Sequence, residues 1–314
     1  MYRYYGNETI VRNHWDQMEK WMRHEMDDAA QATGDYIITR GLGDWCPPVG
    51  KFSPRRIPVQ ESSTAIFYET AIMMDELSKQ LNLTSSLDYC ELATMIKDSF
   101  NRHFWNQDKH CYSTWGTCGV ALKTGLYPDG EHDALVNALV NMIKDDDYEM
   151  STGIYGNKYL LPVLFEEGYG DVAMKIMFTR EHTSFGTMLD DDATSLWECL
   201  EMKNIGMPYE VSTSSYNHPM HSGFAYCLYS DIGGITPLSP GFADFEIRPA
   251  YFTDISGAEV IHICPYGEIK VSWKREAAET HYTITVPANT VGYFRLGDIE
   301  KKMGSGIHAL IVSH

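Results

Sequence analysis

One stretch of the sequence concentrates side chains that can exchange protons. It runs from Asp190 to Glu198 and contains three consecutive aspartates, a Thr-Ser pair, and Trp197 directly before Glu198. The Thr-Ser pair suits the start of a short helix, because a hydroxyl oxygen can accept an unpaired first-turn N–H. A carboxylate beside a large aromatic side chain is typical of acid–base chemistry on sugars. The alternative is a solvated acidic turn before an amphipathic helix.

Three further loop segments hold side chains of the same kinds. Asp44 and Trp45 lie among glycines and prolines, Tyr155 lies between two glycines, and His218 precedes a proline. Each has a structural alternative: the tryptophan can plug a barrel end, the tyrosine can pack under its loop, and the histidine can cap the next helix. Together they favour a sugar site, because sugars are held by aromatic faces combined with carboxylates and neutral hydrogen-bond donors.

The charge of the chain narrows the class of partner. The 314 residues include 25 lysines and arginines against 43 aspartates and glutamates, a formal net charge of −18 at pH 7. Nucleic acids and anionic membranes both require basic surface, so we expect neither as a partner. A neutral small molecule is the class of partner that agrees best with this negative charge. No apolar run approaches the roughly 20 residues that span a bilayer, and we expect no signal peptide.

Seven cysteines are scattered at positions 46, 90, 111, 118, 199, 227 and 264. Their odd number and irregular spacing match neither a disulfide framework nor a zinc site. We expect mostly reduced, buried thiols, which favours a reducing compartment such as the cytoplasm, with export of the parent protein left open. The sequence also lacks phosphate-binding glycine loops, a nucleophile elbow and a His-Glu-x-x-His helix. It predicts no cofactor and no metal site.

About eight helices would position these side chains, because apolar residues recur along them at three- and four-residue steps. The predicted helices are 8–28, 61–81, 87–104, one around 135–142, 158–167, 171–179, one that contains Trp197, and 219–232. Short turns imply antiparallel helical hairpins, and long loops on one face can build a site. The glycine-rich segment 116–130 is expected to be a connection.

Beyond residue 234 the pattern changes to short segments of alternating polarity, which predict strands. They are 245–248, 259–263, 268–273, 281–286, 292–296 and 309–312. A turn is expected at Pro265-Tyr266-Gly267. The sequence thus predicts an α+β protein, with a helical domain over residues 1–234 and a C-terminal antiparallel β-sandwich over residues 235–314.

Four motifs follow one another in a defined order: Gly43-Asp44-Trp45, Ser151-Thr152-Gly153-Ile154-Tyr155-Gly156, Ala193-Thr194-Ser195-Leu196-Trp197-Glu198 and Tyr216-Asn217-His218. Pro240-Gly241-Phe242 and Pro265-Tyr266-Gly267-Glu268 come after them. This combination resembles the bacterial α-L-rhamnosidases of glycoside hydrolase family 78, which are six-hairpin glycosidases. The resemblance implies an (α/α)6-type helical barrel followed by a β-sandwich. It also implies inverting hydrolysis of terminal α-L-rhamnosides, with a rhamnose-containing glycoside as substrate.

The resemblance also assigns roles to individual residues. Glu198 matches the general base that activates the attacking water. Trp45 matches an aromatic wall of the sugar pocket, and His218 matches a histidine that contacts sugar hydroxyls. Phe185 stands where the family usually has tryptophan, so the substrate contacts there are expected to differ. The remaining residues expected at the pocket are Asp44, Tyr155 and Trp197.

The chain departs from the family at its beginning. The family's general acid lies in an arginine- and glutamate-rich motif upstream of the stretch that Gly6 resembles, and its barrel has twelve helices. We therefore interpret the chain as the C-terminal portion of a rhamnosidase that is weakly active or inactive alone. An apolar stripe of Trp15, Met18 and Met22 would then be exposed on a truncated barrel face and would favour self-association.

Two alternatives stay open at this point. The first is a complete six-hairpin glycosidase of another specificity, in which Asp44 is the acid and Glu198 the base. An inverting enzyme needs two such carboxyl groups about 6.5–9.5 Å apart. The second alternative is a non-catalytic carbohydrate-binding protein that keeps the sugar site without the chemistry.

Overall fold

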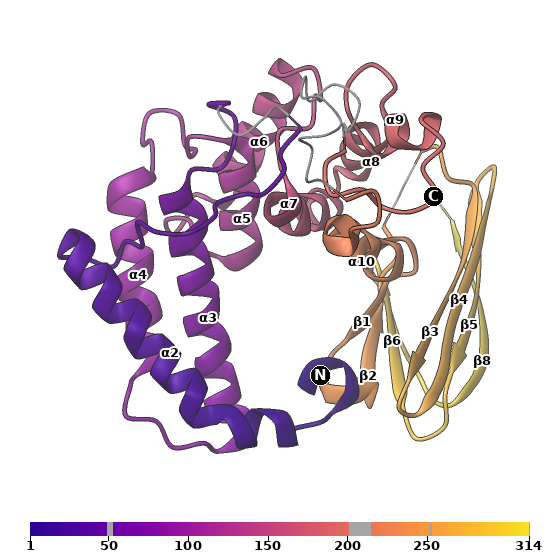
Figure 1. The fold of residues 1–314 in the computed structure, drawn as a ribbon. Helices are drawn as coiled ribbons and strands as arrows, with labels where there is room; N and C mark the ends of the chain where they lie inside the picture. The colour runs from indigo at the N-terminus through magenta and orange to yellow at the C-terminus, as the bar shows by residue number, and fades with distance from the viewer. Residues whose placement is uncertain (49–52, 201–214, 251–252, 314) are drawn as a thin grey trace. The chain divides into compact units, whose positions relative to one another are not determined.

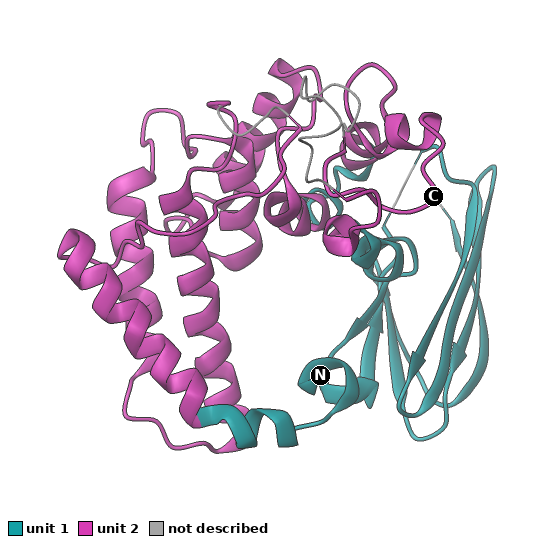
Figure 2. Ribbon diagram, viewed as in Figure 1, with its two compact units in different colours: residues 1–15, 164–171, 224–314 teal, residues 16–163, 172–223 magenta. Residues whose placement is uncertain are grey.

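The computed structural model describes residues 1–48, 53–200, 215–250 and 253–313 (Figure 1). The chain forms two compact units, which Figure 2 colours separately. One is helical and comprises residues 16–163 and 172–223, and the other comprises residues 1–15, 164–171 and 224–314 and contains the strands. This division falls at residue 223, so the domain boundary near residue 234 stays a prediction. Within the described ranges, no helix has the length and apolar character needed to cross a membrane.

Most of the predicted helices are present, and their bounds lie close to the predicted ones. Asp88 begins one of them by accepting a hydrogen bond from the backbone N–H of Glu91, as expected for an N-cap aspartate. The confirmed helices are α2 (Thr9–Thr33), α3 (Val59–Leu81), α4 (Tyr89–Phe104), α6 (His132–Asp145), α7 (Ile154–Glu166) and α8 (Gly170–Phe178). The predicted helix over 219–232 is present as a succession of short turns: η2 (Pro219–Phe224), α10 (Ala225–Cys227) and η3 (Leu228–Ile232).

The glycine-rich segment that was expected to be a connection contains a buried helix, α5 (Trp115–Thr124). Its glycines serve close packing. A Cβ atom on Gly116 would lie 2.6 Å from Ile57 Cγ1, and one on Gly119 would lie 3.0 Å from Leu160 Cα. The prediction was wrong because glycine lowers helix propensity, whereas here its small size lets neighbouring residues approach.

The helix predicted to contain Trp197 is absent. The helix in this region is α9 (Phe185–Asp190), which Ser184 caps by accepting the N–H of Thr187. The acidic run Asp190–Asp192 therefore lies at the end of a helix instead of starting one. Asp192 adopts a left-handed φ of 60°, and the chain from there to Glu198 is not helical.

The apolar stripe on α2 that was expected to be exposed is largely buried. Trp15 is 5% exposed and Met22 is fully buried, while Met18 is half-buried. Glu19 on the same helix accepts hydrogen bonds from Ser85 Oγ at 2.5 Å and Tyr89 Oη at 3.5 Å. This part of α2 therefore packs on the start of α4. The prediction of an exposed stripe is wrong, and self-association loses the observation that motivated it.

The second unit contains two four-stranded sheets (Figure 1). One sheet has the order β1 (Ile235–Pro237), β2 (Asp244–Ile247), β6 (Val291–Leu296), β7 (Ile299–Met303). The other has the order β3 (Gly257–Cys264), β4 (Gly267–Glu276), β5 (Glu279–Val286), β8 (Gly306–Ser313). Six of these strands were predicted; β1 and β7 were not.

The sandwich departs from the predicted antiparallel arrangement at one pair, because β2 and β6 are parallel. Its core joins the two sheets through aromatic side chains such as Tyr282 and Phe294, whose ring centroids are 5.1 Å apart. The unit also contains the N-terminal turn α1 (Tyr2–Tyr5), which packs on η4 (Pro240–Phe242) through Tyr4 and Phe242, with ring centroids 5.7 Å apart.

Candidate active site

Glu198 and Trp45, which are 153 residues apart in the sequence, meet in the helical unit. The Trp45 indole Nε1–H donates to Glu198 Oε1 over 3.3 Å, and the backbone N–H of Ser215 donates to Oε2 over 2.9 Å. The Ser215 N–H is the main cause that lowers the pKa of Glu198, and Trp45 and the nearby His218 and His221 lower it further. The carboxylate is therefore ionised at neutral pH and has a fixed orientation.

The backbone around Glu198 pairs with the segment that holds His218. The N–H of Glu198 donates to Ser215 O over 2.8 Å, and the N–H of His218 donates to Leu196 O over 2.7 Å. Trp197 is 5% exposed, and its ring lies edge-on to that of Tyr216, with centroids 5.2 Å apart. Two motifs that looked separate in the sequence are thus one structural feature, and Trp197 is part of its packing.

Asp44 connects its own motif, Gly43-Asp44-Trp45, to the motif over residues 151–156. Its side chain is fully buried, and its carboxylate accepts the backbone N–H groups of Gly153 (2.6 Å), Tyr155 (3.0 Å) and Gly156 (3.1 Å). These groups lie at the start of α7, where N–H groups have no partner within the helix. Burial raises the pKa of Asp44 to about 6, against the opposing effect of the three N–H groups and of Arg56.

The glycines of that motif are required by this contact. A Cβ atom on Gly153 would lie 2.0 Å from Trp45 O, and one on Gly156 would lie 2.9 Å from Asp44 Oδ2. The Trp45 carbonyl also accepts the N–H of Ile154 over 2.9 Å. The loop that carries Trp45 is therefore fixed directly onto α7.

The other predicted site residues lie in different surroundings. The Tyr155 ring packs on Tyr159, with centroids 4.9 Å apart, and burial raises its pKa. Phe185 is 3% exposed and lies edge-on to His221, with centroids 6.1 Å apart. His218 is half-buried, and its Nδ1 has no hydrogen-bond partner among the described residues. Among the predicted site residues, Trp45 and Glu198 are therefore the pair whose side chains form a hydrogen bond with each other.

His221 is a site residue that the sequence analysis missed. Its ring is 1% exposed, and its Nε2 lies 2.9 Å from the carbonyl oxygen of Glu198, so the neutral ring donates from Nε2. Burial lowers the pKa of His221 to about 4. The available signal was its spacing of three residues from His218, which places both side chains near the same segment.

The pKa of His221 predicts a loss of stability in acid. In the unfolded chain His221 would bind a proton near pH 6.5, whereas in the folded chain it binds one only near pH 4. The stability that the neutral His221 contributes is therefore complete above pH 6.5 and is lost as the pH falls toward 4. We expect the difference in unfolding free energy between wild type and His221→Gln to change by on the order of 3 kcal/mol across this range. Urea unfolding at several pH values measures it, with the exposed His14→Gln as control. Identical pH slopes for wild type and His221→Gln would contradict the prediction.

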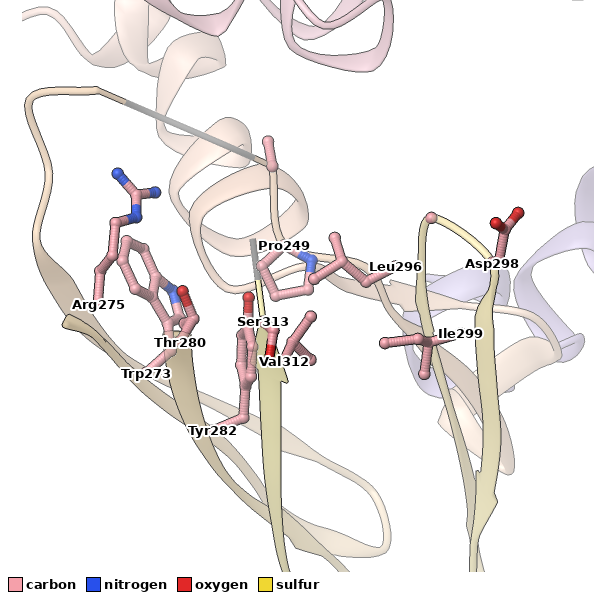
Figure 3. Close-up of a pocket in the computed structure, with 12 residues that line it drawn as sticks. Pro249, Trp273, Arg275, Thr280, Tyr282, Leu296, Asp298, Ile299, Val312 and Ser313 are labelled. Atoms are coloured by element: carbon pink, nitrogen blue, oxygen red, sulfur yellow. The ribbon is translucent and has the colours of Figure 1, made fainter. Parts of the chain in front are cut away.

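Two other features involve none of these site residues. Among the described residues, Asp147, Glu181 and His182 could hold a metal ion, because their ligand atoms lie within 4.8 Å of one another. In the sandwich, a pocket of about 390 Å³ lies between the two sheets (Figure 3). Trp273 and Tyr282 form part of its wall, and Arg275 and Asp298 extend from opposite sides of it. None of these residues was predicted to form a site.

Comparisons with known proteins cover nearly the whole chain. Residues 1–232 match the bacterial alpha-L-rhamnosidase 6 hairpin glycosidase domain, and residues 234–309 match the bacterial alpha-L-rhamnosidase C-terminal domain. An alpha-L-rhamnosidase of Formosa agariphila is 28% identical over 95% of this chain, and one of Streptomyces avermitilis is 26% identical over 92%. The chain spans 32% and 28% of the length of these two relatives, respectively.

Solved structures show the same fold. The alpha-L-rhamnosidase of Streptomyces avermitilis, crystallised with L-rhamnose, superposes with a TM-score of 0.88 at 24% identity, covering 99% of this chain and 32% of that one. The enzyme from Aspergillus terreus gives a TM-score of 0.88 at 21% identity, with 99% and 37% covered. The shared fold is a helical domain followed by a β-sheet domain, and the family model over residues 1–232 makes the helical part a six-hairpin glycosidase domain. The match over residues 1–232 shows that this chain belongs to the bacterial α-L-rhamnosidase family.

Proposed function

We propose that this chain supplies the general base and the aromatic wall of an α-L-rhamnosidase site that hydrolyses terminal α-L-rhamnosides with inversion. The observation that carries the proposal is the Glu198 carboxylate, which is held by Trp45 Nε1–H and the Ser215 N–H and is ionised at neutral pH. An ionised, oriented carboxylate can take the proton of an attacking water. Trp45 is 46% exposed, so one aromatic surface beside this carboxylate stays available to a sugar ring.

We further propose that Asp44 positions the site and does not act as the acid. Its carboxyl group is fully buried, and both oxygens accept backbone N–H groups at the start of α7. A general acid must reach the glycosidic oxygen of the substrate, which this burial opposes. The acid would then come from a part of the protein outside the described residues, and the chain alone would hydrolyse rhamnosides weakly or not at all. The relatives are about three times as long, which supports this view.

Hydrolysis of an aryl α-L-rhamnoside tests the proposal. We would compare this chain with a version extended at its N-terminus and follow the anomer first released by proton NMR. The proposal predicts β-L-rhamnose as the first product, with turnover in the extended protein. An α-anomer as first product would overturn inversion, and binding without hydrolysis in the extended protein would favour a non-catalytic carbohydrate-binding role.

We expect Trp45→Ala to weaken rhamnose binding more than His218→Ala does. The indole removes apolar sugar surface from water, whereas one hydrogen bond to a neutral hydroxyl contributes only about 0.5–1.5 kcal/mol net. Isothermal titration calorimetry of the extended protein measures both variants. Trp21→Ala is the matched control, because Trp21 lies on α2 and is 56% exposed. A larger loss for His218→Ala would remove Trp45 from the pocket wall.

A further inference from the structure

Arg56 holds the loop that carries Trp45, although none of the sequence motifs contains it. It is half-buried and lies three residues before α3. Its Nε–H donates to the carbonyl oxygen of Asp44 over 2.8 Å, and its Nη2–H donates to that of Leu42 over 2.7 Å. A guanidinium group presents its donors in a rigid planar fork, so one side chain fixes two carbonyl groups of the same loop at once.

Gly43, the residue between those two carbonyl groups, leaves room for the guanidinium group. Its φ of 69° lies in the left-handed region that favours glycine. A Cβ atom at this position would lie 3.0 Å from Arg56 Nη2 and 3.1 Å from Val59 Cγ2. The glycine of the Gly43-Asp44-Trp45 motif therefore allows the close contact between the loop and Arg56.

The loop has a second attachment, to α7. There the Asp44 carboxylate and the Trp45 carbonyl oxygen accept backbone N–H groups of residues 153–156. The Trp45 side chain itself is 46% exposed, so the direction of its indole ring depends strongly on how the backbone is held. Arg56 and α7 therefore both fix the backbone from which Trp45 Nε1–H reaches Glu198 over 3.3 Å.

We propose that Arg56 is a positioning residue of the sugar site, which fixes the backbone of residues 42–45 so that the Trp45 indole faces the substrate and keeps its hydrogen bond to Glu198. The roles of Trp45 and Glu198 rest on the proposed function, whereas the attachment of the loop by Arg56 does not. Without the guanidinium group, the carbonyl groups of Leu42 and Asp44 would bond to water and the loop would adopt other positions. The indole would then face a sugar for a smaller fraction of the time, which raises the apparent dissociation constant.

Arg55 provides a matched control one residue away. Its Nη2 lies 2.5 Å from Glu149 Oε2, and its Nη1 lies 3.7 Å from Asp146 Oδ2, so its guanidinium group pairs with two carboxylates. Arg55→Met makes the same chemical change as Arg56→Met and leaves the Arg56 bonds to the loop in place.

Hydrogen exchange of this chain, followed by mass spectrometry, measures the attachment without any need for activity. In Arg56→Met, the N–H groups of residues 153–156 that bond to the loop should exchange about tenfold faster than in Arg55→Met, because the loop has lost two bonds to a charged donor. Peptides from α4 should exchange equally in both variants. Equal exchange at residues 153–156 would overturn the proposal. Faster exchange that extends to α4 would also overturn it, because Arg56 would then stabilise the whole unit.

Kinetics and calorimetry of the extended protein test the effect on the site. Arg56→Met should weaken rhamnose binding about tenfold, and Arg56→Lys should recover part of this loss, because an ammonium group can still donate to one carbonyl. Arg55→Met should bind like the parent. KM for an aryl rhamnoside should rise more than kcat falls, since the Ser215 N–H still holds the Glu198 carboxylate. A merely structural role would instead lower kcat through a smaller folded fraction and leave KM unchanged.

A double-mutant cycle with Trp45→Ala decides whether Arg56 acts through Trp45. In the Trp45→Ala background, Arg56→Met should weaken rhamnose binding by less than about twofold, because the effects of residues in one network do not add. An equal loss in both backgrounds would overturn the positioning role. If the parent extended protein neither binds nor hydrolyses rhamnosides, the proposed function fails, while hydrogen exchange still decides whether Arg56 holds the loop.

Discussion

Glu198→Gln in the protein extended at its N-terminus is expected to lower turnover of an aryl rhamnoside by about 10²-fold or more. The amide keeps the size of the side chain and loses the basicity that water activation requires. Its NH₂ group must also face one of the two donors that now hold the carboxylate, Trp45 Nε1–H or the Ser215 N–H. Rhamnose binding should change far less than turnover, because the ring contacts of Trp45 remain.

Steady-state kinetics and calorimetry on the same preparations separate these two effects. Glu76→Gln is the control, because it makes the same chemical change at an exposed residue of α3 that is not part of the site. A Glu198→Gln enzyme that keeps more than about a tenth of the parent rate would show that this carboxylate is not the base, given the usual size of such effects.

Asp44→Ala is expected to cost at least about 3 kcal/mol of unfolding free energy, because it leaves two buried and one part-buried backbone N–H groups without their acceptor and each buried one costs about 1–3 kcal/mol. The cost should be larger at pH 5 than at pH 7. A pKa of about 6 means that the folded state favours the protonated carboxyl, so the stabilisation by Asp44 falls as the pH rises from about 4 through 6.

Urea unfolding, followed by absorbance or by the circular dichroism signal of the helices, measures this loss of unfolding free energy. Asp98→Ala is the matched control, since Asp98 lies exposed on α4 in the same unit. Asp44→Asn should fall between the two, because its single carbonyl oxygen can still accept some of the N–H groups. A change for Asp44→Ala within about 1 kcal/mol of the control would mean that the buried N–H groups find other partners, and Asp44 would lose its positioning role.

The elements that could be predicted are those whose burial follows one regular period. The stripe on α3 and the alternation of β4 and β5 depend on local sequence alone, and the structure confirms them. Helix α5 could not be found this way, because Gly116 and Gly119 are explained by Ile57 and Leu160, which are distant in sequence. Local propensity cannot register a contact of that kind.

The candidate site shows the same limit. Trp45 and Glu198 were identified from residue type and from a family resemblance, but their hydrogen bond was not foreseen. The segment ending at Glu198 was expected to be helical, whereas it pairs with the segment of Ser215 and His218, about 20 residues further on. His221 was overlooked because its partner is the backbone carbonyl of Glu198, and its spacing of three residues from His218 was the only sequence signal for it.

The separation of 153 residues between Trp45 and Glu198 also determines when the site can form during folding. Trp45 is synthesised 153 residues before Glu198, so its hydrogen bond must wait for that residue, and its loop is not held on α7 until Gly153 and Gly156 reach Asp44. Contacts this distant pay the loop-closure entropy before they contribute energy, so they form slowly. We therefore expect the part of the helical unit that holds Trp45 and Glu198 to be completed after the α3–α4 hairpin, whose contacts are local.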